Sequence, residues 1–215
     1  GIITNVAQAH IENFKNIKGI AKAKSEIINN IDKDGILVLN RDDRFFNYFN
    51  SIARRKKIKI LSFGRSKKAD IYLIQNKISR ANNFLKIRAI DEILNLKTNS
   101  SSNLNISNIL CSIAVLKILN LDLAKIGKFF EENHSLTGRG KIHRVARYKT
   151  KFKLIDESYN ANPSSVKNAI KNLDIIKKKK FKKYLILGDM LELGSKSKKY
   201  HEELSKVINN SDIDK

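Results

Sequence analysis

Two side chains near the start of the sequence have the chemistry of a metal or phosphate site. A strand-like run, Thr4-Asn5-Val6, leads into a polar loop that carries His10, and a helical segment that carries Lys24 follows. Ligands of open α/β sheets bind beyond the carboxyl ends of the strands, where we expect His10 to lie. From these residues alone, a hydrogen-bonding loop histidine and a solvated helix lysine are the more frequent alternatives.

Two further groups suit a nucleotide. Asn105 and Asn108 stand at the start of an apolar helical segment, where asparagine commonly caps the helix. The turn Gly138-Arg139-Gly140 brings a guanidinium group close to the backbone, an arrangement suited to phosphate, although Gly-Arg turns are common in loops. His143 follows this turn. The alternative to a role in ligand binding is a structural role for this histidine.

The longest polar segment runs from Asp156 to Asn162 and reads Asp-Glu-Ser-Tyr-Asn-Ala-Asn. It follows a strand-like run and precedes Pro163, and proline is favoured in the first turn of a helix. Asp156, Tyr159, Asn160 and Asn162 are therefore candidates to line a ligand cleft. A well-capped loop between a strand and a helix is the structural alternative.

The elements that must position these groups alternate between short apolar runs and helical patterns, which is typical of an α/β fold with a mostly parallel sheet. Segments 71–74, 84–90 and 93–96 alternate in polarity and indicate a small antiparallel sheet. We place a domain boundary after residue 149, which gives domains 1–149 and 150–215. The other predicted strands are 1–6, 35–39, 58–63, a pair within 142–156 and a buried strand at 181–187, and the predicted helices are 17–31, 42–54, 106–119, 123–133, one that begins at Pro163, and 198–208.

Composition limits the class of protein. A hydrophobic content of 41% indicates a folded chain, and the single cysteine, Cys111, excludes an internal disulfide and fits a reducing cytoplasm. No run approaches the roughly 20 apolar residues of a membrane span. The first residues lack the basic and apolar regions of a signal peptide. They resemble a core strand, and we therefore expect the sequence to begin in the middle of a domain.

The net charge of +22 raises the alternative of a nucleic-acid-binding module. The lysines, however, are spread along the chain, and the compact basic runs 54–57 and 177–180 stand where helices are expected to end, a position that favours cations. No aromatic residues are interleaved with these runs, as a stacking platform for bases requires. We therefore expect a solvated basic surface without a nucleic-acid partner.

Several of these segments resemble motifs of the Mur ligase family. The residues from Thr4 to His10, followed by Lys24, are similar to the family's T-N-V-x-x-x-H and A-K elements at the family's spacing, with Ala-Gln where Gly-Pro is usual. The two asparagines at 105 and 108 are similar to an H-N-x-x-N-A element in which Leu104 replaces the histidine. The Arg139 turn is similar to the family's G-R-x-x-x-H element.

Two later segments resemble the branch of the family that adds D-alanyl-D-alanine. The segment from Asp156 to Pro163 is similar to D-D-S-Y-N-A-N-P, with Glu157 in place of the second aspartate. The segment Gly-Asp-Met-Leu-Glu-Leu-Gly at 188–194, followed by His201, matches G-D-M-x-E-L-G…H. Sister ligases that add the third amino acid carry a different sequence there, which favours the D-alanyl-D-alanine branch.

The resemblance implies a magnesium site at the first segment. His10 would help to hold Mg²⁺, and Lys24 would carry a carbamate that supports the metal. CO₂ adds only to a neutral amine, and the product is the hard oxygen ligand that Mg²⁺ prefers. The two residues would therefore act together in catalysis.

The resemblance also implies a site for ATP. Asn105 and Asn108 would approach the adenine, Arg139 the phosphates and Asp156 the ribose. Tyr159, Asn160 and Asn162 would line the same cleft. We expect His10, Lys24, Arg139 and Asp156 to converge on one nucleotide-sized cleft.

The implied enzyme is a cytoplasmic, monomeric ATP-dependent ligase that joins D-alanyl-D-alanine to UDP-N-acetylmuramoyl-tripeptide through an acyl phosphate, in the synthesis of peptidoglycan precursors. The family's G-x-x-x-x-G-K-[ST] phosphate loop is missing from the sequence. We therefore expect a fragment, inactive alone, with the second half of the central ATPase domain and the start of a Rossmann-like C-terminal domain. A sister ligase, a folylpolyglutamate synthase and a nucleic-acid-binding module are the alternatives.

Overall fold

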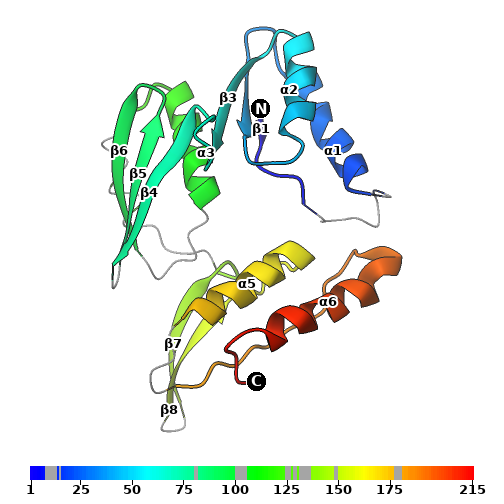
Figure 1. Ribbon diagram of the computed structural model, residues 1–215, viewed down its shortest axis with the longest axis vertical. Helices are drawn as coiled ribbons and strands as arrows, with labels where there is room; N and C mark the ends of the chain where they lie inside the picture. Colours follow the sequence, from blue (N-terminus) through cyan, green and yellow to red (C-terminus); the bar gives the residue numbers. More distant parts are fainter. Residues whose placement is uncertain are drawn as a thin grey trace. The chain divides into compact units, whose positions relative to one another are not determined.

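The computed structural model describes residues 1–7, 14, 16–79, 82–99, 106–123, 127, 130, 137–147, 150–176 and 181–215. It divides into two compact units (Figure 1). The first comprises Gly1–Val6 and Ala21–His134, and the second comprises Ala7–Ile20 and Ser135–Lys215. Each unit has its own buried cluster of apolar side chains.

The first unit is built on one six-stranded sheet in the order β1-β2-β3-β4-β5-β6. The pairs from β1 to β4 are parallel, and the pairs from β4 to β6 are antiparallel. The predicted mostly parallel α/β fold is confirmed, but the three alternating segments extend this sheet through β4 and do not form a separate one. The strands are β1 Ile2–Ile3, β2 Ile36–Asn40, β3 Lys59–Gly64, β4 Ile71–Ser79, β5 Asn82–Ala89 and β6 Glu92–Asn99.

The burial pattern follows the hydrophobic pattern of the strands. In β2 the three consecutive residues Leu37, Val38 and Leu39 are all buried, as in a parallel strand covered on both faces. In β5 buried residues such as Leu85 and Ile87 alternate with more exposed ones, so only one face is covered.

Helices supply the covering layers. They are α1 Ile17–Ser25, continued by the 3-10 helix η1 Glu26–Asn30, then α2 Phe46–Arg55 and α3 Ile106–Ile118. Helix α3 is the most apolar of them and packs against β3, which buries Leu110 and Ile113 in the main core. The predicted helix 123–133 falls mostly outside the described residues. None of the helices that the structure describes has the length and apolar character needed to cross a bilayer.

Two predicted elements are shorter in the structure because side chains bind their backbone. The expected strand 1–6 ends after Ile3: the Thr4 carbonyl accepts from the side chain of Asn40, and Val6 donates its N–H to Asp43. The helix expected from residue 42 begins only at Phe46.

The second unit pairs a β-hairpin with two helices. Strands β7 Lys141–Arg147 and β8 Thr150–Asp156 are antiparallel, and α5 Pro163–Ile175, the 3-10 helix η2 Gly194–Lys196 and α6 Ser197–Asn209 follow. Ile170 of α5 packs with Met190, Tyr200 and Leu204 in a small core. The predicted boundary after residue 149 falls between β7 and β8, where residues 148–149 are outside the described part, and stays a prediction.

The predicted buried strand 181–187 is wrong. Leu185 donates its N–H to the Lys215 carbonyl over 2.7 Å, but no strand is formed there. Phe181 is 50% exposed and Ile186 is 91% exposed, whereas Lys183 is buried. Its ammonium group donates to the Asp174 carbonyl over 2.8 Å, because a buried cation requires a partner. Leu185 is the member of this run that packs against the small core of the second unit, and it is only partly buried.

The core of the first unit makes a prediction on stability. Ile71 and Ile78 lie on the same strand, β4, but Ile71 is fully buried and Ile78 is 75% exposed. We expect Ile71→Ala to lower the free energy of unfolding by about 2–5 kcal/mol, since it leaves a cavity. Ile78→Ala, the matched control, changes only β-propensity and should cost about 1 kcal/mol or less. Denaturant unfolding measures both, and equal losses would contradict the assigned core.

Candidate functional site

The second unit joins the Gly-Arg-Gly turn to the polar loop that follows β8. Gly138 donates its N–H to Asp156 Oδ2 over 3.0 Å, and its carbonyl accepts from the Tyr159 N–H over 3.1 Å. Gly140 donates its N–H to the Asp156 carbonyl over 2.8 Å. Two segments that are separate in the sequence are therefore held as one structural element, which we call the turn–loop cluster (residues 138–140 and 156–159).

Gly138 is required at its position for two reasons. Its φ angle is 74°, in the left-handed region that side chains rarely adopt. A Cβ atom added there would lie 2.8 Å from the Tyr159 Cβ and 2.9 Å from the Tyr159 backbone nitrogen. The close approach of the turn to the loop therefore depends on the missing side chain.

Arg139 and Tyr159 stack on each other within the turn–loop cluster. The guanidinium carbon of Arg139 lies 4.3 Å from the centroid of the Tyr159 ring, within the range of a cation–π interaction. The Tyr159 residue is 68% exposed, so the pair stands at the surface. The stack restricts the orientation of the guanidinium group. No carboxylate of the described residues forms an ion pair with it.

Asp156 is the anion of the turn–loop cluster. Its Oδ1 accepts from the Ser158 hydroxyl over 2.6 Å and from the Ser158 N–H over 3.1 Å, and its Oδ2 lies 3.9 Å from His143 Nε2. The Ser158 hydroxyl, the Ser158 and Gly138 N–H groups and the His143 charge lower the pKa of the Asp156 carboxyl, the first having the largest effect. The carboxylate is thus ionised at neutral pH.

The two asparagines of the polar loop have local structural roles. Asn162 is the N-cap of α5: its Oδ1 accepts from the Ser164 and Ser165 N–H groups over 3.0 and 2.9 Å, and Ser165 Oγ accepts from the Asn162 N–H in return. Asn160 Oδ1 accepts from the Ala161 N–H over 2.8 Å. These bonds match the structural alternative for both residues, and their contact with a nucleotide stays a prediction.

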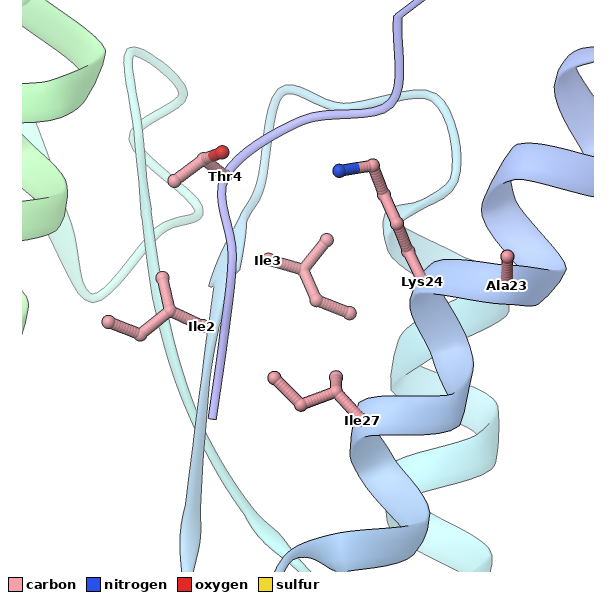
Figure 2. A pocket seen from close by; sticks show the side chains of 6 residues that line it. All are labelled: Ile2, Ile3, Thr4, Ala23, Lys24 and Ile27. Carbon is pink, nitrogen blue, oxygen red and sulfur yellow. The ribbon is translucent and has the colours of Figure 1, made fainter. Parts of the chain in front are cut away.

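Lys24 lies in the first unit, in a pocket of about 270 Å³ at the end of β1. Figure 2 shows its side chain extending from α1 toward Thr4, with Ile3 and Ile27 beside it. Apolar side chains outnumber polar ones among the lining residues, but the surface open to the pocket is more polar than apolar, and the Lys24 amine and the Thr4 hydroxyl are its polar side-chain groups. His10 lies outside the described residues, so its predicted meeting with Lys24 is untested.

The asparagine pair stands at the start of α3, also in the first unit. The helix begins at Ile106, which places Asn108 in its first turn, and Asn105 is outside the described residues. The structure thus brings Arg139, Asp156 and Tyr159 together, whereas the predicted convergence of the two units on one cleft stays a prediction. The described residues contain no group of three His, Cys, Asp or Glu that could hold a metal.

Sequence reasoning missed three residues of the loop after β2. Asn40 and Asp43 bind the backbone of Thr4 and Val6, and Asp42 accepts from the Arg65 and Ser66 N–H groups. The sequence carries a signal there, two adjacent aspartates after a buried strand, but the pattern from residue 42 predicts the start of a helix.

Comparisons with known proteins relate both parts of the chain to one family. Residues 1–116 match the Mur ligase middle domain, and residues 143–215 match the Mur ligase, glutamate ligase domain. The chain is 31% identical to the UDP-N-acetylmuramoyl-tripeptide–D-alanyl-D-alanine ligase of Rickettsia prowazekii, over 96% of this chain and 45% of the relative. It is 30% identical to the ligase of the same name from Buchnera aphidicola subsp. Baizongia pistaciae, over 99% of this chain and 44% of the relative.

The fold is similar to a crystal structure of MurF from Acinetobacter baumannii, with a TM-score of 0.85 and 24% identity. The match covers 99% of this chain and 45% of that one. The chain thus spans less than half the length of the relatives that it matches.

The left-handed glycine gives a second prediction, on stability. Gly138→Ala should lower the free energy of unfolding by about 1–3 kcal/mol, because it forces alanine into a left-handed backbone and against Tyr159. Gly188→Ala is the matched control, since nothing lies within 4 Å of the added Cβ. Thermal unfolding compares the two, and a Gly138 variant as stable as the control would contradict the close approach.

The hydroxyl of Ser158 gives a third prediction, on pH. Because it lowers the pKa of Asp156 below the usual 3.8, Ser158→Ala should raise that pKa toward 3.8. Asp156 contributes stability above its unfolded pKa, and this is lost as the pH falls through the lower folded pKa. Carboxyl-carbon NMR titration measures the shift. Ser164→Ala, which removes a serine that bonds Asn162 through its backbone N–H, should leave the pKa of Asp156 unchanged.

Proposed function

The chain belongs to the Mur ligase family, and from this premise we propose that it is part of the ATP-dependent ligase that joins D-alanyl-D-alanine to UDP-N-acetylmuramoyl-tripeptide. Two relatives carry that name, and the segments 156–163 and 188–194 resemble the same branch. The observation that carries the proposal is the turn–loop cluster, in which one set of hydrogen bonds joins the turn that carries an exposed arginine to the loop that carries an ionised aspartate.

The turn–loop cluster has the groups that a nucleoside triphosphate needs. Arg139 has a guanidinium group without a carboxylate partner among the described residues, and its planar donors fit phosphate oxygens. Asp156 accepts three hydrogen bonds at its two oxygens, while a carboxylate has about four acceptor positions, so one ribose hydroxyl can be added. ATP bound there would supply the phosphoryl group that activates the tripeptide carboxylate.

In this proposal the residues of the chain orient the substrates and offset their negative charge. None of them acts as a nucleophile. The tripeptide carboxylate takes the γ-phosphoryl group to give an acyl phosphate, and the amine of D-alanyl-D-alanine then displaces phosphate. Such transfers depend on orientation and charge stabilisation. Arg139 would offset phosphate charge, Asp156 would orient the ribose, and Asn105 and Asn108 would contact the adenine. We place the reaction in the cytoplasm, on a monomer of the full-length protein.

The Lys24 pocket is proposed to serve the same reaction. Its volume of about 270 Å³ leaves space for a carbamate on the lysine, and the Thr4 hydroxyl is a polar group beside it. His10 and carbamylated Lys24 would then help to hold Mg²⁺, which would reduce the repulsion between the phosphates and the attacking carboxylate. The described residues do not form a metal site by themselves, so further ligands would have to come from other residues.

A fourth prediction tests the proposal on the full-length protein. We expect phosphate release from ATP only when both UDP-N-acetylmuramoyl-tripeptide and D-alanyl-D-alanine are present, and none from the 215-residue chain alone. Arg139→Ala should lower kcat/KM for ATP by about 100-fold, because a donor to the phosphates is removed. A coupled phosphate assay measures these rates.

Arg144→Ala is the matched control, since Arg144 is an exposed arginine on the neighbouring strand β7. Its kcat/KM should stay within about twofold of the wild-type value. Turnover with a single amino acid in place of D-alanyl-D-alanine would favour a sister ligase or a folylpolyglutamate synthase. Phosphate release by the 215-residue chain alone would contradict the proposal that this chain holds only part of the catalytic site.

A further inference from the structure

The segment Thr4–Val6 is held by side chains at the end of β2 and in the loop that follows it. Asn40 Nδ2 donates to the Thr4 carbonyl over 2.9 Å. Asp43 Oδ2 accepts from the Val6 N–H over 2.7 Å. These two bonds bracket Asn5 and begin where the regular pairing of β1 with β2 stops after Ile3. Side chains therefore determine the backbone path beyond the end of β1.

The orientation of the Asn40 side chain is fixed at both of its ends. Its Oδ1 accepts from the Asp42 N–H over 2.9 Å, so its Nδ2 must face the Thr4 carbonyl. The same Nδ2 lies 3.5 Å from Ser107 Oγ in the first turn of α3, a weak contact. Asn40 thus touches both the segment that leads into the predicted metal loop and the helix that carries Asn108.

Asp43 is fixed in the same way. Its Oδ1 accepts from the Phe45 N–H over 2.8 Å while its Oδ2 binds Val6. Each of its two oxygens thus accepts one backbone bond, and the bond to Val6 is partly buried and spans 37 residues of sequence. A charged acceptor on a backbone N–H is stronger than a neutral one, so this bond is suited to fix a loop.

The held segment forms part of the Lys24 pocket. Thr4 and Lys24 both line it, and Figure 2 shows the Lys24 amine directed toward the strand end where Thr4 lies. A shift of the Thr4–Val6 backbone would therefore move one wall of the pocket relative to Lys24. Val6 itself is buried, 7% exposed, which opposes a second path for the chain.

The neighbouring Asp42 provides a contrast within the same loop. Its carboxylate accepts from the Arg65 N–H over 2.5 Å and from the Ser66 N–H over 3.1 Å, and so holds the turn after β3. Gly64 permits this approach, since a Cβ there would lie 2.9 Å from the Asp42 carboxylate. Two adjacent carboxylates thus hold two different segments, and only one of these segments borders the Lys24 pocket.

We propose that Asn40 and Asp43 are positioning residues for the ligase: they set the backbone of Thr4–Val6 and thereby the wall of the Lys24 pocket. The inference rests on the proposed function of the Lys24 pocket. Neither residue needs to touch the nucleotide or the reacting atoms. Their effect reaches the site through the Thr4 carbonyl and the Val6 N–H.

The fifth prediction compares Asp43→Asn with Asp42→Asn in the full-length protein. An amide keeps one acceptor oxygen and loses the other, so Asp43→Asn should speed hydrogen exchange of the Val6 N–H by about tenfold. It should lower kcat by about 10-fold to 100-fold through misplacement of the pocket wall. The KM for D-alanyl-D-alanine should change by less than about twofold, because its binding groups are untouched.

Asp42→Asn is the matched control, with the same chemical change one residue earlier. It should speed exchange of the Ser66 N–H, leave Val6 protected and keep kcat within about twofold. Both variants should lose similar thermal stability, so a difference in kcat reports positioning. If Asp43→Asn does not fold, Asn40→Asp serves as the second variant: it replaces the donor to the Thr4 carbonyl with an oxygen and should lower kcat in the same way.

Each outcome decides a separate point. An unchanged kcat in a variant with a freely exchanging Val6, or an equal loss of kcat in the Asp42 control, would overturn the positioning role. Continued protection of Val6 in Asp43→Asn would overturn the structural contact itself. A wild-type protein that turns over with no amine donor would instead overturn the proposed function, while the exchange experiment would still decide whether Asp43 holds Val6.

Discussion

The hydrogen bond from the Gly138 N–H to the Asp156 carboxylate is the contact on which the candidate nucleotide site depends. It joins a turn before β7 to a loop after β8, and these segments bracket the whole hairpin. The left-handed backbone at Gly138 allows the approach, and Ser158 completes the environment of the carboxylate. Arg139 is carried on the same turn and is therefore part of the same cluster as Asp156. The bonds from the Gly140 N–H to the Asp156 carbonyl and from the Tyr159 N–H to the Gly138 carbonyl support the same approach.

Carboxylates that bind backbone N–H groups recur where strands end in this chain. Asp156 binds Gly138 and Ser158, and Asp43 binds Val6 and Phe45. Asp70 accepts from the N–H and the hydroxyl of Ser62 and so joins β3 to the start of β4. Beyond a strand end the ladder bonds are lost, and an ionised acceptor replaces them with bonds of greater strength. In a chain with net charge +22, several of its few acidic residues are thus used to fix loops.

Much of the fold could be predicted because periodicity reports burial. The apolar run of β2 and the alternation in β5 marked a parallel and an antiparallel strand, and Pro163 marked the first turn of α5. The start of α2 and the end of β1 were wrong because Asp43 competes for backbone bonds, which no local pattern reveals. Of the site, the residue types at Arg139 and Asp156 could be read from the sequence. The joining of their two segments could not, since it depends on the bond between Gly138 and Asp156 across the hairpin.

The central claim is that Arg139 and Asp156 bind the same nucleotide. A crystal structure of the full-length protein with a non-hydrolysable ATP analogue tests it most directly. We predict that the Arg139 guanidinium group contacts phosphate oxygens while an Asp156 oxygen accepts from a ribose hydroxyl, with the bond to Gly138 retained. An analogue bound elsewhere, with Arg139 still stacked on Tyr159 and Asp156 in contact only with the protein, would contradict it.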